Sequence, residues 1–253
     1  MKKIFFFLGG ADAEMSRIRE ILENENVRFA NAHLGWGAKA SAYDSQIAEA
    51  AEAGFTPVLV ELEVDCDLPE TAVVIDHHGK RANEPASLLQ VLALLGREPT
   101  RWDRIVAAND AGWFPGLQAM GATPEEMMTV RLADRQAQGI TPELEAEAER
   151  ALSAPEKWIG NIRVMRMTHS KTTPLGDRLA VEAISAGEPI PSYLVLSGDG
   201  EVNFSGDGAL CTKLQKKFEG WSGGAGLGQA GETAFWGGYP PHEQVLAFLK
   251  NSQ

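Results

Sequence analysis

Residues 73–79 read Val-Val-Ile-Asp-His-His-Gly, and this stretch decides how the rest of the chain is interpreted. With Ala72 before it, the apolar run is too short for a helix and rich in β-branched side chains, which is typical of a buried strand in a parallel sheet. Open α/β sheets bind their ligands at the carboxyl ends of the strands. The stretch therefore predicts an α/β fold with Asp76, His77 and His78 at a ligand-binding edge.

An acid and two imidazoles together offer the oxygen and nitrogen donors that suit Mn²⁺, Zn²⁺ or Fe²⁺. The alternative is that His77 and His78 cap the following helix or bond to backbone in a turn. For one histidine we would favour that alternative. For Asp-His-His at the end of a strand, we favour a metal site.

The composition limits the classes of function. At 253 residues the chain can form one large domain or two smaller ones. Its net charge of -12 argues against a broad basic surface that grips an extended nucleic acid. A phosphate-bearing substrate can still bind where metal ions supply positive charge locally.

Cysteine use and hydropathy indicate the compartment. Cys66 and Cys211 are far apart and lack metal-binding spacing, so a reducing cytoplasm fits the sequence. The apolar run in the first ten residues is too short for a signal peptide and is interrupted by Asp12. No later stretch is long enough to span a bilayer, so we expect no membrane partner.

The first segment predicts a strand at 3–8, a glycine turn, and a helix at 11–24. This places Asp12 and Glu14 at the carboxyl edge of the strand. Asp12 can instead be a helix N-cap, and Glu14 a first-turn acid favoured by the helix dipole. The segment alone supports both interpretations equally.

A second strand, at 27–32, leads into a loop that carries His33, Trp36 and Lys39 before a helix at 41–53. These side chains could bind a base and a phosphate, or they could simply pack the loop. Glycines on both sides of Trp36 suggest close approach by another molecule, which favours binding.

A third strand, at 58–62, runs into a dense group of acids, of which Glu61 is the first choice for a ligand and Glu63 the second. A core helix at 85–95 and another at 102–108 follow. Asp110 comes directly after the latter, where an acid is unfavourable to the helix dipole, so it needs another partner. A metal ion or a bound proton would serve.

The second half predicts helices of mixed polarity within 124–152, a domain boundary within 153–162, and strands at 163–168, 193–196 and 202–205. Helices are expected at 210–218 and 245–250. The glycine-rich stretch 222–231 allows a backbone nest for phosphate or carboxylate, although such loops also occur as plain turns.

In order, Asp12, an acid after the third strand, Asp76-His77-His78 and Asp110 resemble the motifs of the DHH phosphoesterase family. That family includes RecJ-type exonucleases, oligoribonucleases and cyclic-dinucleotide phosphodiesterases. The resemblance covers roughly residues 1–120. It implies a DHH-like metal-binding domain at 1–122, a helical connector at 123–160 and a smaller α/β, DHHA1-like substrate-binding domain at 161–253.

The resemblance also implies divalent metal, usually Mn²⁺, with Mg²⁺, Zn²⁺ or Fe²⁺ as alternatives, activating a water and clamping a phosphoryl group. His77 would orient or protonate and would be catalytic together with Asp76. The implied metal ligands are Asp12, Glu61, Asp76, His78 and Asp110, with Glu14 and Glu63 as further candidates. The implied substrate-binding residues are His33, Lys39, Gly223, Gly224 and Gly226.

Two departures from the family pattern matter. The histidine that usually opens the first motif falls among Phe7, Leu8 and Gly9, and the glycine-rich loop has no histidine at 225–227. His33 would be the residue to compensate for the missing histidine of the first motif.

The first hypothesis is a hydrolase acting on a small phosphorylated, nucleotide or oligonucleotide substrate held between two lobes. The alternative is a catalytically degenerate relative that binds a nucleotide as a sensor or partner protein. A nuclease on single strands is less favoured because clustered basic residues are few. The sequence is compatible with a homodimer and with a monomer.

Overall fold

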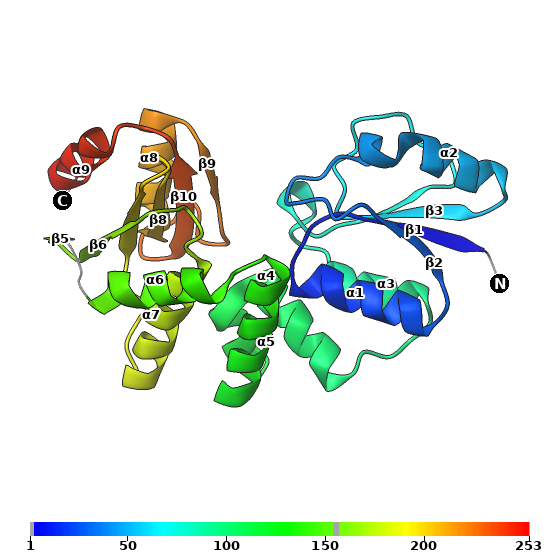
Figure 1. The fold of residues 1–253 in the computed structure, drawn as a ribbon, viewed down its shortest axis with the longest axis horizontal. Coiled ribbons are helices and arrows are strands. Elements are labelled where there is room, and N and C mark those ends of the chain that lie inside the picture. The colour runs from blue at the N-terminus through cyan, green and yellow to red at the C-terminus, as the bar shows by residue number, and fades with distance from the viewer. Residues whose placement is uncertain (1–2, 154–156, 253) are drawn as a thin grey trace. The chain divides into compact units, whose positions relative to one another are not determined.

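The computed structural model describes residues 3–153 and 157–252. The chain divides into two compact units, Met1–Gly139 and Ile140–Gln253 (Figure 1). The division falls inside the predicted connector 123–160, because the helices on its two sides pack in different units. Residues 154–156 of the predicted boundary segment lie outside the described residues.

A four-stranded parallel sheet forms the centre of the N-terminal unit. Its strands are β1 (Ile4–Leu8), β2 (Arg28–Asn31), β3 (Thr56–Val60) and β4 (Val73–Ile75), in the order β2-β1-β3-β4. Each neighbouring pair runs parallel, so all four carboxyl ends meet at one edge. The predicted α/β class with a parallel sheet is confirmed, and the strands lie within two residues of their predicted ends.

Helices cover both faces of this sheet. On one face lie α1 (Ala13–Asn24) and α3 (Ser87–Leu94), and on the other lies α2 (Asp44–Glu52), preceded by the short helix η1 (Ala40–Tyr43) (Figure 1). Burial of apolar strand residues on both faces explains why β1 and β3 read as continuous apolar runs. A single turn, η2 (Gly79–Arg81), follows the histidine pair.

Two longer helices complete the unit, α4 (Arg101–Ala119) and α5 (Pro124–Ala137), and both pack on α1. The predicted helix end before Asn109 is wrong, because α4 continues and breaks at Trp113, whose φ and ψ are 49° and -141°. Pro115 lies just beyond the break and has no amide to continue the helical ladder. Asp110 therefore lies near the end of the first half of α4.

The C-terminal unit is built on a six-stranded mixed sheet of order β5-β6-β7-β8-β10-β9. Only β6 (Ile162–Met167) and β7 (Tyr193–Ser197) pair in parallel among these strands. The other strands are β5 (Lys157–Ile159), β8 (Val202–Asp207), β9 (Trp221–Gly223) and β10 (Thr233–Gly238).

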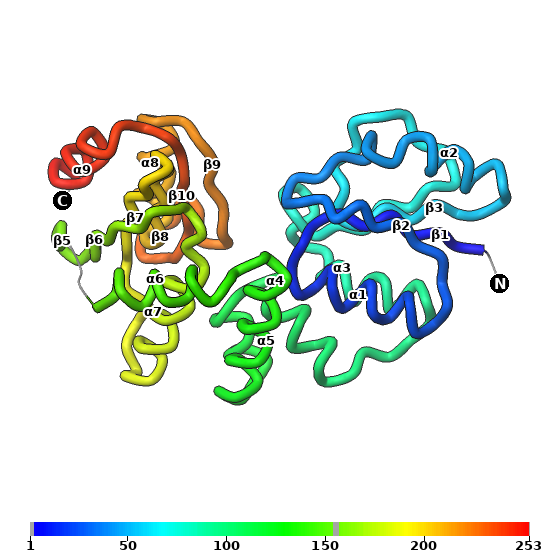
Figure 2. The backbone as a smooth tube through the Cα atoms, in the orientation of Figure 1, coloured from blue at the N-terminus to red at the C-terminus, as the bar shows by residue number. Residues whose placement is uncertain are grey.

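Its helices are α6 (Pro142–Ser153), α7 (Thr173–Ala186), α8 (Gly208–Phe218) and α9 (His242–Asn251), and the path of the chain between them can be followed in Figure 2. Two apolar clusters hold them to opposite faces: one contains side chains from α8 and α9, the other side chains from α6 and α7. Among the described residues, no helix combines the length and apolar character that crossing a membrane requires.

Candidate metal centre

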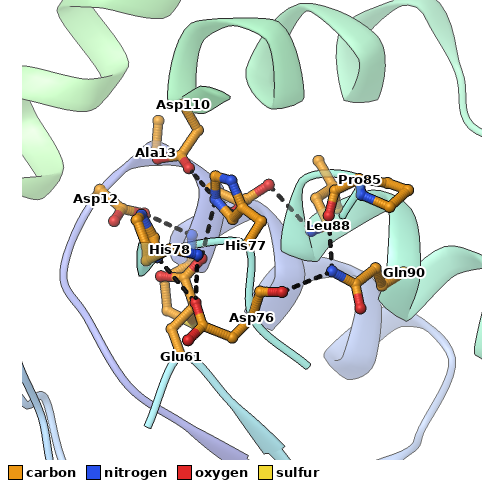
Figure 3. A network of polar contacts seen from close by, with 12 residues as sticks. Asp12, Ala13, Glu61, Asp76, His77, His78, Pro85, Leu88, Gln90 and Asp110 are labelled. Carbon is orange, nitrogen blue, oxygen red and sulfur yellow. Dashed lines mark hydrogen bonds and ion pairs between the residues drawn. The ribbon is translucent and has the colours of Figure 1, made fainter. Parts of the chain in front are cut away.

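The polar cluster lies at the carboxyl edge of the parallel sheet in the N-terminal unit. Asp12 comes shortly after β1, Glu61 directly after β3, and Asp76, His77 and His78 directly after β4. Parallel strands bring these positions together, as the sequence predicted. Asp110 reaches the same place from α4 (Figure 3).

His77 is at the centre of the cluster. Its side chain is 7% exposed, and its Nε2 lies 2.6 Å from Oδ2 of Asp110, 3.5 Å from Oε2 of Glu14 and 3.5 Å from Oε1 of Glu61. Burial lowers the pKa of the imidazole, but the three carboxylates outweigh this effect and raise that pKa to about 12. The site thus concentrates negative charge around one buried nitrogen.

The surroundings of these four atoms show whether a metal ion would fit the site. Oε2 of Glu14, Oε1 of Glu61, Nε2 of His77 and Oδ2 of Asp110 are all buried, and the contacts that join them are the ion pairs between this one nitrogen and the three carboxylates. One imidazole nitrogen cannot satisfy three buried carboxylate oxygens, so the cluster has acceptor capacity that a bound cation would fill. Carboxylate oxygen and imidazole nitrogen are suitable donors for a divalent transition metal.

His78 belongs to the same group. Glu61, His77, His78 and Asp110 each offer one potential ligand atom, and these atoms all lie within 4.8 Å of one another. His78 is the most exposed of the four, so the cluster has one side open to solvent. A substrate could approach from that side.

Asp76 makes its contact with His78 rather than with the buried group. Its Oδ1 accepts the backbone N–H of His78 at 2.9 Å and lies 3.0 Å from Nδ1 of the same residue. A carboxylate on Nδ1 leaves Nε2 as the nitrogen available to a metal. The backbone oxygen of Asp76 accepts a hydrogen bond from Gln90, which fixes the strand end on α3.

Glu61 is held in an unusual backbone conformation. Its φ is +51°, a region that residues other than glycine, asparagine and aspartate rarely adopt. Its carbonyl packs so tightly that a Cβ on Gly9 would lie 2.4 Å from that oxygen. This explains why glycine, and not a histidine, follows β1, and strained backbone is common where a side chain must be aimed at a site.

Asp12 fulfils the capping role that the sequence left open, because its Oδ1 accepts the N–H of Met15 at 2.8 Å. It also belongs electrostatically to the cluster. Burial, followed by the charges of Asp110 and Glu61, raises the pKa of Asp12 to about 7. The two interpretations are thus compatible, although Asp12 is not among the four residues that group most tightly.

Glu14 is buried and links α1 to α3. Its Oε1 accepts the backbone N–H of Leu88 at 3.0 Å, in the first turn of α3, and its other oxygen faces His77. Burial is the main cause that raises the pKa of this carboxyl well above its usual value. The partial positive charge at the N-terminus of α3, where Leu88 lies, also favours an acid at this position.

Three predicted residues of the N-terminal unit lie outside the close group. Glu63 is exposed and joins the preceding loop through backbone hydrogen bonds with residues 38 and 40. His33 is exposed with a φ of +53°, and Lys39 is exposed beside Glu63. Trp36 is 85% exposed, so it does not pack this loop.

The glycine-rich stretch with Gly223, Gly224 and Gly226 belongs to the C-terminal unit, where close backbone packing accounts for its glycines. A Cβ on Gly226 would lie 2.6 Å from Cβ of Glu232. Asp207 takes the position of an anion at this loop: its two oxygens accept the N–H groups of Leu210 and Gly231 at 2.8 and 2.7 Å. The N–H groups of Leu210 and Gly231 therefore already have a carboxylate partner.

A set of buried polar residues behind the cluster was not predicted from the sequence; it consists of Asn109, Arg131 and Asp134. They lie on α4 and α5, and Asp134 contacts α1 across 121 sequence positions. No local motif marks such a contact.

Comparisons with known proteins give fold-level likenesses. No family model matches the chain, and no curated protein matches it. A pGpG-specific phosphodiesterase from Vibrio cholerae is 13% identical with a TM-score of 0.43, covering 99% of this chain and 98% of that one. An exonuclease RecJ bound to manganese is 11% identical with a TM-score of 0.39, covering 98% and 89%. An uncharacterized protein from Helicobacter pylori G27 is 12% identical with a TM-score of 0.30, covering 98% of each chain.

Proposed function

We propose that this chain is a divalent-metal-dependent phosphoesterase whose metal centre is the cluster of Glu61, His77, His78 and Asp110. The observation that supports it most is the convergence of three buried carboxylate oxygens, on Glu14, Glu61 and Asp110, around the single buried nitrogen Nε2 of His77. Without a cation, this concentration of carboxylates is costly. With a cation, the carboxylates would gain a second positive partner beside His77.

The metal ligands would be Glu61, His77, His78 and Asp110, with Asp12 and Glu14 at the edge of the site. This assigns His77 to the metal in addition to the orienting role predicted for it. Mn²⁺ is the first choice, since the donor set mixes oxygen with imidazole nitrogen. When bound, such an ion supplies positive charge for a phosphoryl oxygen and lowers the pKa of a water molecule.

The chain's own side chains would do the positioning. The carboxylate of Asp76 holds His78 through its Nδ1, so that Nε2 faces the cluster. Asp12 would hold a proton near neutral pH on Oδ2, because its Oδ1 accepts the Met15 amide. A carboxyl with a pKa near 7 suits proton transfer to or from a reacting oxygen.

A small substrate is favoured over a long nucleic acid. The chain carries 35 acidic against 23 basic residues, so counterion release from a long phosphate backbone would contribute little. His33, Trp36 and Lys39 are exposed on the loop after β2, at the same sheet edge, and would contact a base and a phosphate. In the C-terminal unit, the DHHA1-like role of Gly223, Gly224 and Gly226 would be to bind a phosphate or carboxylate of the substrate through their backbone.

The test is metal content and turnover in the same samples. Protein loaded with Mn²⁺ and freed of excess ion is measured for bound metal and for hydrolysis of the dinucleotide pGpG. Wild type should retain Mn²⁺ and release nucleotide, and His77→Ala should lose both. His169→Ala is the matched control, because His169 also has a carboxylate neighbour, Glu147 at 3.3 Å, but lies in the other unit.

Wild-type protein that retains no Mn²⁺, Zn²⁺ or Fe²⁺ would contradict the proposed metal centre. Retention of Mn²⁺ and binding of pGpG without release of product would instead favour the nucleotide-binding sensor.

A further inference from the structure

A buried polar network on α4 and α5 joins the segments that carry Asp12 and Asp110. Its members Asn109, Arg131 and Asp134 are 5%, 4% and 5% exposed, so they depend on one another rather than on solvent. None of them belongs to the group that could hold a metal. The cost of burying an ion pair suggests a purpose beyond stability, since apolar residues of the same size often stabilise as well.

One arm of the network reaches the N-terminus of α1. Oδ1 of Asp134 accepts the backbone N–H of Ala13 at 3.1 Å. Ala13 is the first residue of α1 and directly follows Asp12, and its amide is one of the donors that the helix itself cannot satisfy. Asp134 therefore fixes the backbone at the position from which Asp12 enters the cluster.

The other arm reaches α4. Nη1 of Arg131 donates to Oδ1 of Asn109 at 2.9 Å and to Oδ2 of Asp134 at 2.9 Å. Asn109 directly precedes Asp110, in the last regular turn before the break at Trp113. The break separates this turn from the part of α4 that follows Trp113, and Arg131 on α5 ties the turn to Asp134.

Gln138 closes the network, because its Nε2 donates to Oδ2 of Asp134 at 2.9 Å. The carboxylate of Asp134 thus receives donors from α1, from its own helix and from the residue that ends that helix. Its orientation is over-determined. Because Asp134 is held in this way, a shift of its side chain would move both the start of α1 and the turn of α4 that carries Asn109.

We propose that Arg131 and Asp134 are positioning residues that set the distance between Asp12 and Asp110 and so tune the metal centre without touching it. The inference rests on the proposed function. Partners of ligand-bearing segments affect metal affinity when ligands must be held to a fraction of an ångström.

The experiment compares the Mn²⁺ dissociation constant with the stability of the metal-free protein. Free Mn²⁺ is measured by electron paramagnetic resonance, and unfolding by urea. Arg131→Met and Asp134→Ala should weaken Mn²⁺ binding about 10- to 100-fold. Asp134→Asn, which keeps an oxygen for the Ala13 amide, should retain more affinity than Asp134→Ala.

Arg17→Met is the matched control. Arg17 pairs with the buried Asp103 at 2.7 Å and also joins α1 to α4, but away from the cluster. It should lower stability and leave Mn²⁺ affinity unchanged. If Asp134→Ala does not fold, Asp134→Asn and Arg131→Lys carry the comparison.

Unchanged Mn²⁺ affinity in folded Arg131 and Asp134 variants would show that the network only stabilises the fold, and would overturn the inference. Equal weakening in Arg17→Met would also overturn it, because general loosening would then explain the effect. Wild-type protein that binds no Mn²⁺ contradicts the proposed function itself, and the positioning role with it. The three results are distinguishable.

Discussion

The cluster around His77 and the glycine-rich loop of the C-terminal unit both look like ligand sites in the sequence, but they differ in how their polar atoms are satisfied. Around His77, three buried carboxylate oxygens converge on one imidazole nitrogen, which cannot satisfy all of them. At the loop, Asp207 already occupies the backbone donors of Leu210 and Gly231. The stronger candidate site is therefore the one whose buried polar atoms lack enough hydrogen-bond partners, and not the one with the most glycine or acidic residues.

The largest expected effect comes from removing a buried carboxylate of the cluster. Asp110→Asn should weaken Mn²⁺ binding by more than about 100-fold, beyond the loss of an outer partner, because it removes a proposed ligand. The same change should lower the thermal midpoint of the metal-free protein, since it removes the carboxylate that lies 2.6 Å from Nε2 of His77 and stabilises the charged imidazole. Calorimetry with and without Mn²⁺ measures both effects; unchanged Mn²⁺ affinity in the folded variant would contradict the proposed metal centre.

The pH dependence of the metal-free protein gives the next effect. The pKa of Asp12 in the folded protein is about 7, against an ordinary value of 3.8, so the folded state binds the proton more tightly. Stability should therefore fall as pH rises from about 4 to 7, by up to roughly 4 kcal/mol. Urea titrations of wild type and Asp12→Asn across this window measure the difference. A wild-type curve parallel to that of Asp12→Asn would show that Asp12 does not titrate here.

A smaller effect is expected in the C-terminal unit, at Gly208 in the first turn of α8. A Cβ there would lie 1.8 Å from the carbonyl oxygen of Gly226, so Gly208→Ala should cost about 3 kcal/mol of unfolding free energy. Mn²⁺ affinity should not change. Gly35→Ala is the control, because a Cβ at Gly35 meets nothing within 4 Å. A loss of Mn²⁺ affinity in folded Gly208→Ala would remove the contrast between the two regions.

The smallest effect is expected for Asp207→Ala. It removes the cap of α8 and the acceptor for Gly231, which should cost about 1 kcal/mol. It also frees the backbone donors, so inorganic phosphate should stabilise this variant more than it stabilises wild type. Thermal shift against phosphate concentration measures this; equal shifts in both proteins would show that the loop has no latent anion site.

The sequence predicted the strands of the N-terminal unit well, because burial on both sides makes β1 and β3 continuous apolar runs. β4 is also apolar, but it lies at the sheet edge with Val73 37% exposed, so the predicted burial of this strand holds only in part. It also predicted that Asp12, Glu61, His77, His78 and Asp110 meet at one edge, since parallel strands end together. The pairing of Asp76 with His78 was not foreseen, because it depends on side-chain direction rather than on order along the chain.

Other features had no local signal. No prediction was made for α7, and β10 was missed because its sequence Thr-Ala-Phe-Trp-Gly-Gly ends in two glycines that weaken a strand pattern. The contact of Asp134 with Ala13 joins residues from opposite ends of the unit. Arg131 and Asp134 lie on a helix of mixed polarity, where charged residues are normally solvated, so only the structure shows that they are buried.

The most direct test of the metal centre is an anomalous difference map from crystals of the wild-type protein soaked in Mn²⁺ and measured near the manganese absorption edge. We expect a peak between Glu61, His77, His78 and Asp110, within coordination distance of Nε2 of His77. A map with no peak there, with the carboxylates instead hydrogen-bonded to His77, would contradict the proposed metal centre.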